Sequence, residues 1–224
     1  HSVETGESAC QHALGLTLFD YNAQHPETSA LFNQLMTDLT ASVAPTVAAA
    51  YDFSATGTLV DVGGGYGQML ASILQAHPTL HGVLFDLPHV VKGAPPLLEA
   101  AGVAGRCELL GGDGFTAVPA GYETYLLSRV IHDWDDERAV TILTRCHQAM
   151  KPQGKVLLVE RVILTGSSPQ VLVLESDVQM LVVAPGGKER TDAEYRVLLN
   201  AAGFEVTQLI PVLTPFYVIE AVRV

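Results

Sequence analysis

The chain has 224 residues, a formal net charge of −12 and an isoelectric point near 4.9. Such a chain repels phosphates, and no cluster of Lys and Arg offsets the charge, so we expect no nucleic-acid partner. No apolar run approaches the roughly 18 residues of a membrane helix, so we expect no membrane partner. Three scattered cysteines without a Cys-x-x-Cys pair favour a reduced, cytoplasmic setting and no metal site.

Two helical segments come first, at about residues 8–19 and 27–51. Pro45 predicts a kink or a break in the second segment. Apolar residues recur there at intervals of three and four, and we expect most of them in the core, including Leu31, Leu35 and Leu39. A second set of side chains is a candidate lining for a pocket: Phe19, Phe32 and Met36.

The most informative stretch is Leu59–Gly67, where an apolar run stops at Asp61 and clustered glycines follow. Glycines permit positive φ and close approach of a ligand, and the helical segment Gln68–Ala76 can point unpaired N–H groups at bound charge. The dinucleotide pattern Gly-x-Gly-x-x-Gly fails, because its third glycine would fall at Gln68. What remains is Asp-x-Gly-x-Gly-x-Gly, the pattern of S-adenosylmethionine (SAM) methyltransferases, formed by Asp61, Gly63, Gly65 and Gly67.

Two further apolar runs end in candidate ligand groups. Residues 81–86 end at Asp86, where a carboxylate can accept hydrogen bonds from both ribose hydroxyls, as in SAM and NAD folds. Residues 107–110 run into a Gly-rich turn, in which Asp113 could accept from an adenine amine and Phe115 could pack on the ring. Asp113 has a second interpretation as a turn carboxylate beside glycines.

The order of elements predicts an α/β fold. Strands are expected near residues 58–62, 81–86, 107–111, 123–129, 155–161, 204–211 and 215–223. They alternate with helices until the last two, which predicts a mostly parallel sheet of seven strands with an antiparallel last strand, preceded by a helical segment. Loops are expected at Ser168 and Pro169 and at Pro185–Gly187.

His132 follows the fourth strand, at the carboxyl edge where open α/β sheets bind their ligands, and is a candidate catalytic residue. Acidic residues crowd the start of the next helix: Asp133, Asp135, Asp136 and Glu137. The helix dipole favours negative charge there, so these side chains predict a cap and a solvated first turn.

Together these segments resemble the plant-type and bacterial small-molecule O-methyltransferases, the family that contains caffeic acid and hydroxyindole O-methyltransferases. The matching segments are Asp61–Gly67, Asp86–Pro88, Gly112–Phe115, His132–Trp134, Gly154–Glu160 and Pro185–Thr191. The resemblance implies a Rossmann-like class I methyltransferase fold with SAM as cofactor and S-adenosylhomocysteine as product. It also implies methyl transfer to a hydroxyl of a small aromatic secondary metabolite.

In that family a histidine is the general base and two carboxylates orient it, and by resemblance these roles fall on His132, Glu160 and Glu189. A phenol with a pKa of about 10 and an imidazole near 6.5 are mismatched, and a neighbouring carboxylate narrows the gap by stabilising imidazolium. Glu160, at the end of the fifth strand, is suitably placed for this. Glu189 has a second interpretation, in which it neutralises Lys188 or Arg190 on the surface.

Other roles transfer residue by residue. By resemblance, cofactor contacts fall on Asp61, Gly63, Gly65, Gly67, Asp86, Leu87, Asp113, Gly114, Phe115, Ser128, Thr40 and Trp134. Substrate contacts fall on Phe19, Asn33, Met36, Asp133 and Met180. Met180 and Trp134 have a second interpretation as buried apolar residues. Ser128 and Ala184 stand where plant members often carry lysine and asparagine, which argues against a plant-like phenylpropanoid substrate.

Family members usually carry a further upstream domain, winged-helix-like, that swaps across a homodimer and covers the active site. By resemblance, residues 1–52 are the helical connector on the substrate side and residues 53–224 are the SAM-binding catalytic domain. Without the upstream domain, the apolar helices of residues 10–50 are expected to be partly uncovered. Charged residues make up 16%, below the roughly 25% of soluble domains, which also predicts apolar surface docked against another chain.

Three other functions stay open. A relative with decarboxylase or hydroxylase chemistry is disfavoured by the presence of His132, Glu160 and Glu189. A metal-dependent catechol methyltransferase would use Asp133, Asp135 or Asp136 around magnesium. A SAM-sensing or structural domain would bind the cofactor without methyl transfer.

Overall fold

A computed structural model describes residues 1–166 and 171–224, so the loop expected at Ser168 and Pro169 lies outside the described residues. The chain begins with α1 (Ser2–Thr5), α2 (Ala9–Leu14), α3 (Leu18–Gln24), α4 (Pro26–Ala41) and α5 (Ala44–Ala50). The two long helices expected at residues 8–19 and 27–51 are therefore each broken. Gly15, at a φ of 73°, ends α2, and the Thr17 hydroxyl caps α3. Pro45 lies in the first turn of α5, where a missing N–H is tolerated.

The prediction that Leu31, Leu35 and Leu39 lie in the core is wrong. Their exposed fractions are 73%, 52% and 45%, whereas Ser29 and Asn33 on the same helix are buried. The spacing of apolar residues correctly predicts that these leucines share one face of α4. The rest of the described chain packs against a different face, the one that carries Ser29 and Asn33. These leucines therefore form an uncovered apolar ridge.

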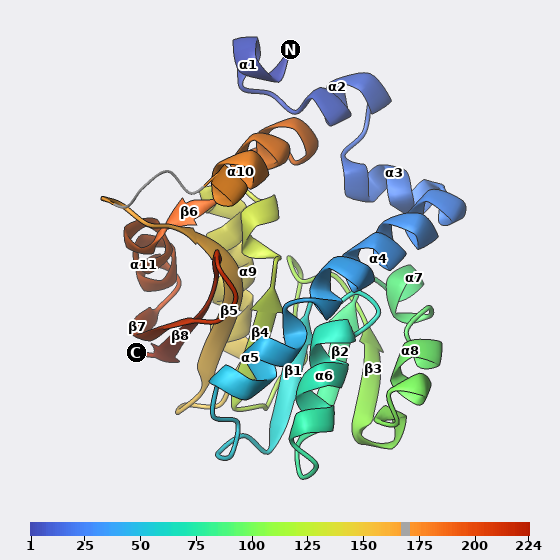
Figure 1. Cartoon of the computed structure of the whole chain (residues 1–224), viewed down its shortest axis with the longest axis vertical. Coiled ribbons are helices and arrows are strands. Elements are labelled where there is room, and N and C mark those ends of the chain that lie inside the picture. Colours follow the sequence, from blue (N-terminus) through green and yellow to red (C-terminus); the bar gives the residue numbers. More distant parts are fainter. Residues whose placement is uncertain (167–170) are drawn as a thin grey trace.

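The sheet has the predicted architecture (Figure 1). Its strands are β1 (Thr58–Val62), β2 (His81–Asp86), β3 (Cys107–Gly111), β4 (Thr124–Ser128), β5 (Lys155–Ile163), β6 (Arg190–Thr191), β7 (Phe204–Pro211) and β8 (Phe216–Arg223). Seven of them run in the order β3-β2-β1-β4-β5-β8-β7, and β6 pairs with β5 beside this path. All neighbours from β3 to β5 are parallel, while β8 is antiparallel to both β5 and β7. The short β6 was not predicted.

Helices cover both faces of the sheet. One core cluster joins the strands to α5, α6 (Gln68–Ala76) and α8 (Pro95–Ala100), and the other joins them to α9 (Asp136–Ala149) and α11 (Asp192–Ala201). Alternate strand residues such as Leu59 and Val60 belong to opposite clusters, as a sheet buried on both faces requires. Because α5 shares the first cluster, it packs as part of the sheet core. The division expected at residue 52 stays a prediction.

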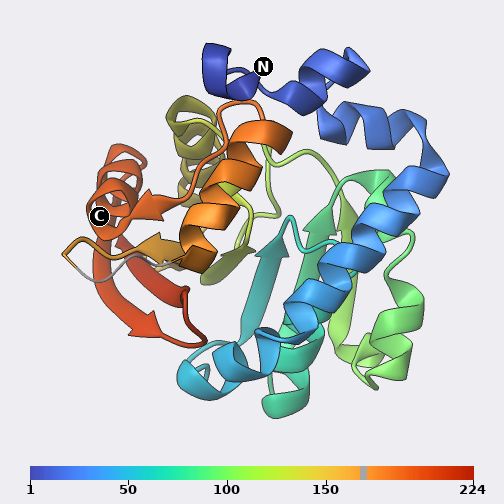
Figure 2. The same cartoon turned by 45° about the horizontal axis from the view of Figure 1, so that its top comes forward.

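The carboxyl ends of β1 to β4 point toward the same end of the molecule. There lie α1 to α4, α7 (Pro88–Val91), α10 (Val171–Val183) and the short helix η2 (Ile131–Asp133), and α4 runs obliquely down to α5 beside α6 (Figures 1 and 2). The remaining short helix is η1 (Ala104–Arg106). None of the helices described has the length and apolar character that crossing a bilayer demands.

Candidate active site

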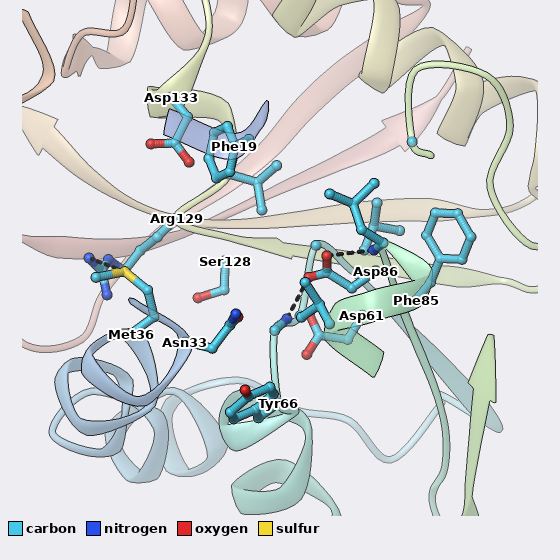
Figure 3. Close-up of a pocket in the computed structure, with 18 of the residues that line it drawn as sticks. Phe19, Asn33, Met36, Asp61, Tyr66, Phe85, Asp86, Ser128, Arg129 and Asp133 are labelled. Carbon is cyan, nitrogen blue, oxygen red and sulfur yellow. Dashed lines mark hydrogen bonds between the residues drawn. The ribbon is translucent and has the colours of Figure 1, made fainter. Parts of the chain in front are cut away.

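A cavity of about 570 Å³ lies between the carboxyl edge of the sheet and α4 (Figure 3). Most of the residues predicted to bind cofactor or substrate line it: Phe19, Asn33, Met36, Thr40, Asp61, Gly63, Gly65, Asp86, Leu87, Asp113, Gly114, Phe115, Ser128, Asp133 and Trp134. The other predicted residues are not part of its lining: Gly67, His132, Glu160, Met180 and Glu189.

Gly67 and Met180 do not line the cavity, and their predicted roles in binding stay predictions. Gly67, at a φ of 87°, begins α6, and a Cβ added to it would lie 3.1 Å from Leu84 and 3.3 Å from Leu98. This glycine therefore serves helix packing rather than the cavity wall. Met180 is buried on α10, in agreement with its second interpretation as a buried apolar residue.

The glycine loop brings two carboxylates to the cavity. Gly63 and Gly65 have φ values of 71° and 60°, and the Gly65 amide donates to Asp86 Oδ2 at 2.7 Å. The Leu87 amide donates to Asp86 Oδ1 at 2.6 Å. Burial raises the pKa of Asp86, and these two amide donors oppose the shift.

Asp61 is fully buried, and neither of its carboxylate oxygens has a hydrogen-bond partner in the part of the chain that the structure describes. Burial, together with the charge of Asp86, raises the pKa of Asp61 to about 7. The middle glycine of the loop, Gly64, was missed by the sequence pattern. A Cβ there would lie 2.4 Å from Leu84 Cδ1 and 2.6 Å from Asp61 Oδ2, so only glycine leaves room for the Asp61 side chain.

Aromatic side chains form one wall of the cavity. The ring centres of Phe115 and Trp134 lie 4.8 Å apart edge to face, and those of Phe19 and Trp134 lie 5.4 Å apart. Asp113 Oδ1 accepts from the Phe115 amide at 2.9 Å, so Asp113 is a turn carboxylate as well as a lining residue.

His132 lies in η2, between the lining residues Val130 and Asp133, and is itself buried. Its Nδ1 lies 3.1 Å from Glu189 Oε1 and 3.9 Å from Glu160 Oε2, which leaves Nε2 on the side of Asp133, 3.6 Å from Oδ1. Burial lowers the pKa of His132, but the surrounding carboxylates, Glu160 foremost, outweigh burial and raise it to about 9.

The two glutamates are held in different ways. Glu160 Oε1 accepts from the amides of Val130 and Ile131 at 3.0 and 2.8 Å, and burial raises the pKa of Glu160 to about 7. Burial also raises the pKa of Glu189, but the hydrogen bond from His132 and the contact with Ser176 outweigh it and lower that pKa. Glu189 therefore carries the negative charge opposite the imidazole.

The interpretation of Glu189 as a surface partner of Lys188 or Arg190 is wrong. Its side chain is buried and binds Ser176 Oγ at 2.5 Å and Arg161 Nη1 at 3.4 Å. Lys188 and Arg190 instead both bind Asp136, at 3.0 and 2.8 Å.

The interpretation of the acidic run as a cap and a solvated turn holds for only part of it. Asp135 caps α9 by accepting from the Arg138 amide at 2.8 Å. Asp133 instead belongs to η2, where it lines the cavity and lies beside His132, because the strand ends earlier and a turn intervenes before the helix. Asp133, Asp135 and Asp136 thus have separate partners, which does not favour a shared magnesium ion.

A different trio has metal-ligand spacing. One ring nitrogen of His132 and one carboxylate oxygen each of Glu160 and Glu189 lie within 4.8 Å of one another. The same atoms form the imidazole–carboxylate cluster described above. The expectation that the protein uses no metal stays a prediction.

Arg129 is one of the lining residues that the sequence analysis did not select. It follows β4, has a φ of 56°, and its Nη2 lies 3.7 Å from Met36 Sδ (Figure 3). A left-handed backbone at an arginine leaves no trace in composition or spacing.

The O-methyltransferase domain family matches residues 2–205. A phenazine O-methyltransferase of Lysobacter antibioticus is 42% identical over 221 residues, which cover 99% of this chain and 64% of that protein. A mitomycin biosynthesis 6-O-methyltransferase of Streptomyces lavendulae is 40% identical over 211 residues, which cover 94% of this chain and 60% of that protein. The chain thus spans about three fifths of the length of these relatives.

Solved structures agree with this. The mitomycin 7-O-methyltransferase MmcR superposes with a TM-score of 0.95 at 39% identity, covering 100% of this chain and 66% of that one. An O-methyltransferase from neocarzinostatin biosynthesis, solved with SAM and 2-hydroxy-5-methyl naphthoic acid, superposes with a TM-score of 0.91 at 35% identity, covering 100% and 66%. The family match, the shared fold and the sequence identity together show that the chain belongs to the O-methyltransferase domain family.

Proposed function

We propose that the chain is the SAM-binding, catalytic part of an O-methyltransferase that methylates a phenolic hydroxyl of an aromatic secondary metabolite. One observation carries this proposal. An imidazole held by two glutamates stands directly behind the wall of a cavity that also contains the glycine loop and Asp86. By their names, one relative described above is a phenazine O-methyltransferase and another acts in mitomycin biosynthesis, and the neocarzinostatin enzyme was solved with a hydroxynaphthoic acid, which supports the choice of acceptor.

The residues of the cavity fit SAM. The Asp61 carboxylate, buried and unpartnered among the described residues, would take an ammonium group. Asp86 keeps lone pairs beyond its two amide donors, and these would accept from ribose hydroxyls. Phe115 and Trp134, which pack edge to face, would together contact the adenine ring. The other cofactor contacts in this proposal are Thr40, Gly63, Gly65, Leu87, Asp113, Gly114 and Ser128.

When bound, SAM supplies an electrophilic methyl group. The chain has to hold the acceptor oxygen in line and remove its proton. Phe19, Asn33 and Met36 shape the acceptor end of the cavity. His132 takes the proton at Nε2, since its Nδ1 is engaged by Glu189, and the two glutamates stabilise the imidazolium that results.

The proposal includes a cytoplasmic homodimer, with residues 1–52 on the substrate side. Exposed apolar side chains support the dimer: Leu31, Leu35 and Leu39 on α4, with Val171, Leu172, Leu174, Val178 and Val182 on α10. An exposed apolar area of this kind is typical of protein interfaces. The cysteines are all unpaired, which fits a reducing compartment. Light scattering of the purified protein gives the mass, and a monomer would contradict the dimer.

Two measurements test the function. Calorimetric titration with SAM reports binding, and incubation with methyl-labelled SAM and a panel of phenols reports transfer. We expect both for the wild-type protein. Binding without transfer would favour the SAM-sensing alternative, and turnover that is lost in chelator would favour the metal-dependent one.

A further inference from the structure

Arg129 has a strained backbone. Within residues 1–166 and 171–224 it is the one non-glycine residue at positive φ, with a φ of 56°. Side chains rarely adopt this region, because Cβ crowds the neighbouring carbonyl oxygen. The Arg129 amide donates to the Val159 carbonyl at 3.0 Å, which fixes the residue between β4 and η2. Such strain concentrates at functional sites, and here it places a guanidinium at the cavity wall.

The Arg129 guanidinium is left without an anionic partner by the described residues. Its Nη2 contacts Met36 Sδ at 3.7 Å, and its Nε is buried without a hydrogen-bond partner. A partly desolvated cation with unfilled donors is unfavourable, so such groups are usually paired in native proteins.

The nearby carboxylates are already engaged. Glu160 accepts from two backbone amides and faces His132, and Glu189 binds His132, Ser176 and Arg161. Asp133 lies 3.6 Å from His132 Nε2, and its charge stabilises the Arg129 cation, but no ion pair joins it to the guanidinium within the described residues. The other cation of the cluster, Arg161, repels Arg129. The described carboxylates thus act on Arg129 without binding its guanidinium, which leaves its donors free to pair with an anionic group of a bound molecule.

The position of Arg129 indicates which bound molecule would pair with it. Figure 3 shows Arg129 and Met36 on the opposite side of the cavity from Phe85, Asp86 and Asp61, with Asp133 and Phe19 above them. The glycine loop and Asp86 form the cofactor end, so Arg129 belongs to the acceptor end. A planar guanidinium pairs with a carboxylate through two parallel hydrogen bonds, and this geometry recognises planar anionic groups.

We propose that Arg129 determines specificity by binding a carboxylate on the acceptor ring, so that the preferred acceptor is a hydroxylated aromatic carboxylic acid. This inference rests on the proposed function. The net charge of −12 repels anionic substrates from the molecule as a whole, so a cation inside the cavity is needed for an acidic acceptor to bind.

Matched pairs of acceptors test the inference. Hydroxynaphthoic acids and the naphthols that lack only the carboxylate are compared as substrates of the wild-type protein, Arg129→Met, Arg129→Lys and the control Arg138→Met. Arg138 also lines the cavity but lies over Trp134, at 5.7 Å from its ring centre. We expect the wild type to prefer at least one acid over its naphthol by tenfold or more, on the order of one charge-assisted hydrogen bond.

In Arg129→Met, kcat/KM for that acid is expected to fall by about 10- to 100-fold while the naphthol changes by less than about threefold. Arg129→Lys keeps the positive charge but not the planar guanidinium, so its kcat/KM for the acid is expected to lie between those of the wild type and Arg129→Met. Arg138→Met is expected to keep the wild-type ratio of kcat/KM for acid and naphthol. Thermal melting shows that each variant is folded, and titration with SAM is expected to give an unchanged Kd for the two Arg129 variants.

Three results would overturn the inference. The wild type could show no preference for acids, Arg129→Met could lower turnover of acid and naphthol equally, or its Kd for SAM could rise tenfold, which would move Arg129 to the cofactor end. If no acceptor of either class is methylated, the proposed function fails instead. Arg129 is then tested alone by titrating a hydroxynaphthoic acid into the protein saturated with S-adenosylhomocysteine, where equal affinity of wild type and Arg129→Met would refute its role.

Discussion

Arg190 binds Asp136 through Nη2 at 2.8 Å, and its guanidinium also donates to the carbonyls of Ile131 and Trp134 at 3.0 and 2.7 Å. The Arg190 side chain is fully buried and directly follows Glu189 in the chain. One side chain thus ties the segment that carries His132 to β6, which begins directly after Glu189.

Arg190→Met is expected to lower the free energy of unfolding by about 3 kcal/mol, because two buried carbonyls lose their donor at about 1–3 kcal/mol each. Urea denaturation followed by circular dichroism measures this. The matched control is Arg196→Met, since Arg196 pairs with Asp192 on the surface at 3.1 Å and such pairs contribute less than about 1 kcal/mol. An equal loss of unfolding free energy in the two variants would contradict this role of Arg190.

His132→Ala is expected to lower kcat by about 10²- to 10⁴-fold, the range for loss of a general base, while the Kd for SAM changes by less than about threefold. Steady-state kinetics and calorimetry measure the two quantities. His81→Ala is a suitable control, because His81 is exposed at the opposite edge of the sheet. An unchanged kcat in His132→Ala would remove this residue from the mechanism.

The pH profile should report the His132 imidazole. Its pKa is raised from 6.5 to about 9, and only the neutral ring can accept a proton, so kcat/KM is expected to rise with pH up to about 9. Glu189→Gln removes one carboxylate that stabilises imidazolium, so the midpoint moves toward lower pH even as the rate falls. A midpoint that stays in place or moves upward in this variant would exclude Glu189 as a partner of the base.

Affinity for SAM should depend on pH through Asp61. The pKa of this carboxyl is raised to about 7, so it is largely protonated below pH 7, whereas a cationic group beside it favours the ionised form. Binding therefore releases a proton, and the Kd is expected to fall as pH rises from 5.5 to 7. Calorimetry in two buffers of different ionisation enthalpy measures the released proton. Asp61→Asn should bind SAM weakly and without this dependence.

Gly64 and Gly65 are expected to have different roles, because Gly64 packs closely against neighbouring side chains and Gly65 faces the open cavity. Gly64→Ala is expected to cost about 1–3 kcal/mol of stability, because its Cβ would overlap Leu84 and Asp61. At Gly65 the nearest atom is Asn33 Oδ1, 3.9 Å from an added Cβ, so a larger residue meets backbone strain at a φ of 60° and the open cavity. Gly65→Val is therefore expected to raise the Kd for SAM more than Gly64→Ala does. Gly64→Ala is expected to act mainly on stability. Normal SAM affinity in Gly65→Val would show that the backbone does not approach the ligand there.

The strands were predictable because parallel strands buried on both faces are continuous apolar runs, and those runs end at Asp61 and Asp86. His132 and Glu160 could be located because β4 and β5 are parallel neighbours, in which Ser128 pairs with Val159 and Glu160 therefore lies beside the segment that follows β4. The prediction that Glu160 lies at the end of β5 is wrong, because the strand continues to Ile163. The environment of Glu189 could not be read from its basic neighbours in sequence. The position of Glu189 depends on the pairing of β6 with β5, and β6 has only two residues, too few for a recognisable strand pattern.

The errors have physical causes too. Apolar periodicity shows that a helix has an apolar face but not what covers it, so Leu31 and its neighbours on α4 were assigned to the core. Asp133 was assigned to a helix start because the turn between β4 and α9 has no sequence marker. Arg129 carries no sign of its left-handed backbone.

The cavity is assembled from segments that are far apart in the chain. The strand ends and the glycine loop, from Asp61 to Phe115, supply one side, and α3 and α4 supply Phe19, Asn33 and Met36 on the other. An exchange of residues 17–36 between homologous proteins is therefore expected to alter which compounds are accepted, while the proposed cofactor contacts, Thr40 included, are kept. Chimaeras with that crossover give a practical route to new regioselectivity while the proposed base, His132, is kept.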